Sequence, residues 1–183
     1  TIVEWNRILN NEFVKNGKSV DPLLETEWGQ SAGWDEYVPA GTPVGCVATA
    51  MAQVMNYHEH PATGAGWHTY TPPTYGAQYA EFYNTEYSWS NMPDNYGSDA
   101  SALLSYHCGV AVDMNYSSTG SGAYTRDATY AMANYFKYDQ GIKHAELANY
   151  SPTDWENLLK SELDASRPIL YSGSDASFGH ALV

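Results

Sequence analysis

The sequence predicts an α+β fold in which a helical half comes first along the chain and strands gather near its end. Three observations support this prediction. Residues 46–58 are small and apolar with helical periodicity, residues 151–163 carry the signals of a capped helix, and short apolar segments appear late, at 168–172 and 179–183. With 183 residues, the chain is long enough for one domain with a hydrophobic core, so we expect helices packed on an antiparallel sheet.

The amino-terminal elements follow from local patterns. Residues 1–20 have apolar side chains at helical spacing and are predicted to form a short helix and connector, separate from a main domain over residues 21–183. Residues 21–45 are a loop rich in Gly, Pro and Trp. The helix over residues 46–58 is expected to stop before Pro61. Its buried stripe is expected to consist of Val47, Ala50, Met51, Val54 and Met55.

The later elements are less regular. Aromatic residues over 67–89 indicate irregular strands and loops, and helices are predicted over 98–108 and 125–136. Between these two helices we expect a short extended piece at 110–114 and then a Ser/Gly loop at 117–123. The last helix begins with a cap at Ser151, proline at the first helical position and Asp154 in the first turn.

Composition excludes some functions. Eight basic and 21 acidic residues give a net charge of −13, which repels phosphate backbones, so nucleic-acid binding is not expected. The longest apolar stretch, residues 44–55, is too short and too interrupted for membrane insertion. Abundant tyrosine with little lysine fits an extracellular protein. We expect no metal or other cofactor, because His58, His60 and His68 lack the spacing of a zinc site.

Cys46 is the candidate nucleophile. It follows Gly45 and opens the apolar helix, where unpaired amides and the positive end of the helix favour a thiolate. A small buried core cysteine is the alternative, and position alone leaves both roles open. Cys108 is expected to be buried by helix packing. A disulfide between the two cysteines is not favoured, because two cysteines are too few for a disulfide framework.

Two polar residues could complete a catalytic site with Cys46. His180 follows Gly179 and begins an apolar strand, a position that suits a histidine facing a cleft and relaying a proton to and from a thiol. Its separation from Cys46 lies within the roughly 130–150 residues found in papain-like enzymes, although the papain local signature is absent. Gln30, in a loop before Cys46, can donate from its amide to an oxyanion. A loop histidine and a solvated glutamine are the alternatives.

Together these residues resemble the streptopain family of bacterial cysteine peptidases. The resemblance runs from about residue 21 to residue 183 and is carried chiefly by residues 45–58, with further matches at 23–30, 109–116, 154–155, 168–171 and 179–181. It implies a papain-like fold with a cleft between its halves. It also implies a secreted, extracellular endopeptidase made as a zymogen with an inhibitory pro-segment, which cleaves protein or peptide substrates through an acyl-enzyme.

The resemblance also assigns site residues. It implies Cys46 as nucleophile, His180 as general base and acid, and Gln30 in the oxyanion hole. Ser121, Gly122 and Gly179 match positions that line the cleft for a hydrophobic side chain before the scissile bond.

The sequence departs from the family at its end. The family has an Asn or Asp beyond the histidine that orients the imidazole, and this sequence stops at Val183. We therefore expect the catalytic domain to be incomplete at its carboxyl end, and a protein ending there to be nearly inactive and poorly folded alone.

Two other functions stay open. One is a different Cys–His enzyme, an amidase or transglutaminase-like acyl transferase, which shares the chemistry but has a different cleft. The other is a non-catalytic binding domain on the same fold. The presence of Cys46, His180 and Gln30 disfavours the second.

Overall fold

The computed structural model describes residues 21–174 and 179–183, and the helix expected over residues 1–20 lies outside this part. The described helices and strands mix as the α+β prediction requires. They are α2 (Cys46–His58), β1 (Trp67–Tyr70), β2 (Gln78–Glu81), α3 (Asp99–Ala111), α4 (Asp127–Tyr135), α5 (Pro152–Asp164), β3 (Tyr171–Ser174) and β4 (Gly179–Leu182). The division of the chain at residue 20 and the incompleteness of its last domain stay predictions.

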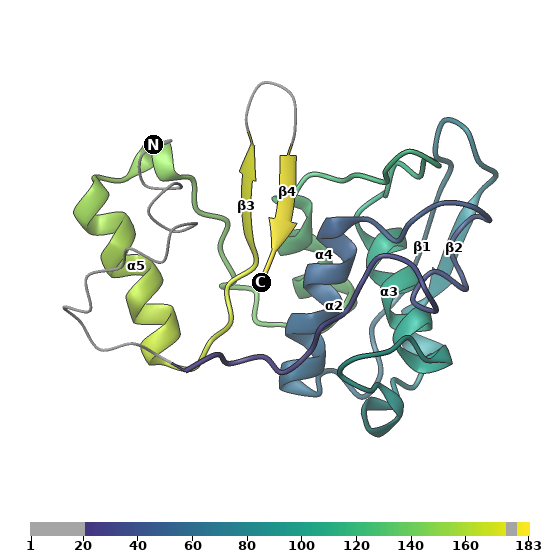
Figure 1. Ribbon diagram of the computed structural model, residues 1–183, viewed down its shortest axis with the longest axis horizontal. Coiled ribbons are helices and arrows are strands. Elements are labelled where there is room, and N and C mark those ends of the chain that lie inside the picture. Colours follow the sequence, from purple (N-terminus) through teal and green to yellow (C-terminus); the bar gives the residue numbers. More distant parts are fainter. Residues whose placement is uncertain (1–20, 175–178) are drawn as a thin grey trace.

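Helix α2 lies at the centre of the described structure and packs against both α3 and β4 (Figure 1). All five residues of the predicted stripe are buried. The helix ends at His58 and is capped by Glu59, which has a left-handed backbone, and Pro61 follows, as expected from the sequence. The small residues Ala48 and Ala52 are fully buried, which lets neighbouring elements approach the helix axis closely.

The described strands form two separate antiparallel hairpins. Strand β1 pairs with β2 so that Thr69 lies opposite Tyr79, and β3 pairs with β4 so that Gly173 lies opposite His180. The β3–β4 hairpin stands between α5 and α2 (Figure 1). Ala181 is the buried residue of β4 and belongs to the same hydrophobic core as the buried face of α2.

Helix α5 has the predicted cap and lies apart from α2 and α3 (Figure 1). The Ser151 hydroxyl oxygen accepts a hydrogen bond from the Asp154 N–H at 3.2 Å, and proline occupies the first turn. The helix has no buried residue in the described structure, and its Trp155 ring contacts Tyr150 and Tyr171. No described helix is long and apolar enough to cross a membrane.

The predicted extended piece at residues 110–114 is wrong. Helix α3 continues through Ala111, and the chain then closes a Schellman turn in which the Met114 N–H donates to the Gly109 carbonyl at 3.0 Å and the Asp113 N–H donates to the Val110 carbonyl at 3.3 Å. A short apolar run does not distinguish a strand from a buried helix end. Strand β3 also begins later than predicted, at Tyr171 rather than at residue 168.

Candidate active site

Cys46 is the first residue of α2, half-buried and with a free thiol. The residue before it, Gly45, has a φ of 96° and is tightly packed. A Cβ at Gly45 would lie 2.6 Å from Met114 Sδ and 3.2 Å from the Ser121 carbonyl oxygen, so only glycine fits there. The start of α2 therefore contacts both the turn after α3 and the Ser/Gly loop.

Gln30 is half-buried and is held near the start of α2 by its backbone. Its carbonyl accepts a hydrogen bond from the Val44 N–H at 2.8 Å, two residues before Cys46. A second contact holds the same loop to α2, since the Trp28 N–H donates to Gln53 Oε1 at 3.3 Å. The sequence interpretation missed Gln53. The available signal was a polar residue inside an apolar helix.

The Ser/Gly loop is anchored on the residue that follows Met114. Asn115 and Gly122 exchange two backbone hydrogen bonds, of 2.9 Å and 3.2 Å. Ser121 is buried, and its hydroxyl oxygen accepts a hydrogen bond from the Ser117 N–H at 3.3 Å. Since the Ser121 carbonyl also faces Gly45, the structure places Ser121 beside the helix start that carries Cys46.

His180 and Gly179 lie on β4 and are exposed. Strand β4 packs against α2, so the strand that carries His180 lies beside the helix that begins at Cys46. The structure thus brings Gln30, Cys46 and Ser121 together through backbone and packing contacts, and adds His180 through packing of its strand. The direct pairing of His180 with Cys46 stays a prediction.

The second cysteine differs sharply from the first. Cys108 is fully buried on α3, and burial raises the pKa of its thiol. Both cysteines are free thiols in the structure. No group of three metal-ligating side chains occurs among the described residues. Of the histidines considered for a metal, His68 instead contacts Asp113 and Tyr135.

A cysteine that opens a central helix, with a histidine on an antiparallel strand packed against that helix, is the arrangement of papain-like cysteine peptidases. Residues 28–183 match the model of the Peptidase C10 family, and the chain belongs to that family. It is 30% identical over 189 residues to the thiol protease/hemagglutinin PrtT of Porphyromonas gingivalis. It is 29% identical over 165 residues to streptopain of Streptococcus pyogenes. The expected family is therefore confirmed.

Solved structures agree with this assignment. The active wild-type interpain A cysteine protease of Prevotella intermedia matches with a TM-score of 0.81 and 38% identity, over 88% of this chain and 74% of that one. A prointerpain A fragment from the same organism matches with a TM-score of 0.82 and 36% identity, over 98% of this chain and 64% of that one. The papain-like fold is confirmed.

The matched relatives are longer than this chain. The alignments cover 90% of this chain but 22% of PrtT, and 82% of this chain but 42% of streptopain. The chain therefore spans less than half the length of either relative.

Proposed function

We propose that this protein is a secreted cysteine endopeptidase that hydrolyses peptide bonds at Cys46. One observation supports the proposal: in a chain of a peptidase family, Cys46 opens a buried helix, and the two residues before it contact the Gln30 backbone and the Ser121 carbonyl. The helix start supplies unpaired N–H groups and a positive dipole end, which favour both a thiolate and an oxyanion. Such a site is suited to acyl transfer through a thiol.

In the proposed reaction the Cys46 thiolate attacks the carbonyl carbon of the scissile peptide and forms a tetrahedral intermediate. The Cys46 N–H and the Gln30 amide donate to its oxyanion. The C–N bond then breaks, and the His180 imidazolium protonates the leaving amine, which leaves a thioester on Cys46. His180 next removes a proton from water, which attacks the thioester; the C–S bond breaks, the carboxylic acid leaves, and the Cys46 thiolate and His180 imidazolium are regenerated.

The proposed cleft takes a hydrophobic side chain before the scissile bond. Ser121, Gly122 and Gly179 are proposed to line it. The small side chains at all three positions leave space for a substrate side chain, and the buried position of Ser121 gives that part of the wall a fixed place. We further propose that the protein is made with an inhibitory pro-segment, as the name of the matched prointerpain A indicates for that relative.

Casein cleavage together with thiol labelling tests the proposal. Expressed at its full natural length, the wild-type protein should cleave casein, and Cys46→Ala should abolish cleavage while its melting temperature stays close to wild type. Iodoacetamide should label Cys46 far faster than Cys108, because Cys46 is half-buried and Cys108 is fully buried. Activity that survives in Cys46→Ala would disprove the assignment. Cleavage of peptidoglycan fragments but not of casein would favour an amidase instead.

A further inference from the structure

Helix α3 ends with an aspartate in a conformation that favours glycine. Asp113 has a φ of 50° at the left-handed position of the Schellman turn, where a side chain is strained. Ser166 occupies the equivalent position after α5, with a φ of 56° and the same hydrogen-bond pattern to Leu163 and Glu162. Both helix ends carry a backbone strain that glycine would remove. The presence of a side chain at Asp113 therefore needs a separate reason.

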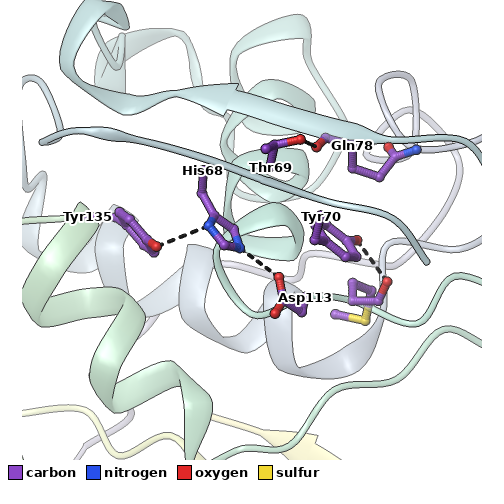
Figure 2. A network of polar contacts seen from close by, with 7 residues as sticks. His68, Thr69, Tyr70, Gln78, Asp113 and Tyr135 are labelled. Atoms are coloured by element: carbon purple, nitrogen blue, oxygen red, sulfur yellow. Dashed lines mark hydrogen bonds and ion pairs between the residues drawn. The ribbon is translucent and has the colours of Figure 1, made fainter.

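The Asp113 carboxylate contacts a histidine on strand β1 (Figure 2). Its Oδ1 lies 2.7 Å from His68 Nε2, and the Tyr135 hydroxyl lies 3.2 Å from His68 Nδ1. Because an ionised carboxylate only accepts hydrogen bonds, His68 Nε2 carries a proton and donates it to Asp113, and His68 Nδ1 lies within hydrogen-bond distance of the Tyr135 hydroxyl. The half-buried imidazole is also stacked on Tyr70, with ring centroids 6.2 Å apart and planes at 10°. His68 is therefore held on three sides.

Strand β1 makes a second hydrogen bond to the same turn. The Tyr70 hydroxyl donates to the Met114 carbonyl at 2.8 Å (Figure 2). Side chains two residues apart on a strand share one face, so His68 and Tyr70 act from the same side. His68 is hydrogen-bonded to the side chain of Asp113, and Tyr70 is hydrogen-bonded to the backbone carbonyl of Met114.

The turn held in this way supports the candidate site. The Met114 side chain is fully buried and packs against Gly45, directly before Cys46. The next residue, Asn115, makes the paired backbone bonds that anchor Gly122. A shift of this turn would therefore move the loop that forms the proposed cleft wall.

We propose that the contact between Asp113 and His68 positions the cleft wall of Ser121 and Gly122, and so sets the preference for a hydrophobic side chain before the scissile bond. The inference rests on the proposed function. Asp113 and His68 are positioning residues, since they act through the turn and its loop. The carboxylate takes the place of glycine at this helix end because it holds the turn to β1.

Substitutions at Asp113 separate this role from helix capping. Asp113→Gly removes the contact and also relieves the backbone strain, so the fold should keep its stability. Asp113→Asn tolerates the left-handed conformation and retains an oxygen that accepts from His68 Nε2–H, so it should restore the wild-type behaviour. Ser166→Gly is the matched control, because it relieves the same strain at the end of α5.

The measurement is kcat/KM for two peptides that differ only in having Leu or Ala at the hydrophobic position. Wild type should prefer Leu. Asp113→Gly should lose about tenfold of that preference, while its melting temperature and the rate of Cys46 alkylation stay at wild-type values. Asp113→Asn and Ser166→Gly should keep the wild-type preference. His68→Phe keeps a ring against Tyr70 but has no N–H for Asp113, and it should reproduce the loss even if Asp113→Gly folds poorly.

Wild-type preference in both Asp113→Gly and His68→Phe would overturn the inference. An equal loss in Ser166→Gly would also overturn it, because strain relief alone would then explain the effect. A wild-type protein that cleaves neither peptide would instead overturn the proposed function, and this inference with it.

Discussion

His107, on helix α3, is a buried histidine whose surroundings disfavour its charged form. Burial lowers its pKa to about 4. The Tyr87 hydroxyl lies 2.9 Å from His107 Nδ1, and burial raises the pKa of Tyr87, so the hydroxyl keeps its proton and can form a hydrogen bond with the neutral imidazole in either tautomer. The ring of Phe82 packs edge-on against the imidazole at 5.5 Å. This environment suits the neutral ring, and we expect acidification to destabilise the fold.

The size of this effect follows from the two pKa values. A histidine in the unfolded chain has a pKa near 6.5, and His107 in the fold has a pKa of about 4. Between these values the unfolded chain binds a proton that the folded chain does not, so the free energy of unfolding falls as the pH falls. Well above pH 6.5 neither state binds this proton, so His107 lowers the free energy of unfolding only below that pH. The loss is about 2 kcal/mol at pH 5 and about 3 kcal/mol once the pH passes below the folded value.

Urea unfolding of wild type and His107→Gln between pH 7.5 and 5 measures this loss. The Gln side-chain amide can accept a hydrogen bond from the Tyr87 hydroxyl or donate one to it, but it does not titrate. Carboxylates contribute to acid sensitivity in both proteins and cancel in the comparison. The stability of wild type relative to the variant should therefore fall by about 2 kcal/mol over this range. Parallel pH profiles would show that His107 is protonated readily in the fold and would refute the reasoning.

Two substitutions test how the start of α2 is built. Gln30→Ala should lower kcat and kcat/KM together by about 100-fold with little change in KM, as expected for an oxyanion donor; steady-state kinetics that show only a raised KM would make Gln30 a binding residue. Gly45→Ala should lower the melting temperature by about 4–8 °C, because its Cβ would meet Met114 Sδ at 2.6 Å in a left-handed backbone. An unchanged melting temperature for Gly45→Ala would mean that Met114 moves aside freely.

The elements predicted correctly from the sequence have strong local signals. Helix α2 combines a long apolar stripe with Pro61 beyond its end, and α5 begins with a serine cap and a proline in the first turn. These signals involve residues close together in the sequence, so they can be recognised without knowing the tertiary structure. The Ser/Gly loop was likewise predictable as a loop, but its two backbone bonds between Asn115 and Gly122 were not.

The end of α3 could not be predicted because its signal is tertiary. The apolar run over residues 110–112 fits a strand as well as a helix. Position 113 is an aspartate and not the glycine that usually marks a helix end. The left-handed turn is stabilised by His68 and Tyr70, which lie more than 40 residues earlier in the chain. His68 was considered only as a metal ligand, since its sequence neighbourhood does not reveal its carboxylate partner.

The same reasoning explains which residues of the candidate site could be predicted from the sequence. The residue types of Cys46, Gln30 and His180 suit catalysis, and the family resemblance assigns all three to one catalytic site. Met114 and Asn115 carry none, yet one packs against the glycine before Cys46 and the other anchors the loop beside it. Both are fixed by a turn that β1 holds through the side chain of Asp113 and the carbonyl of Met114. A residue outside the cleft can therefore alter which substrates fit, because the wall of the cleft takes its position from the turn to which it is bonded.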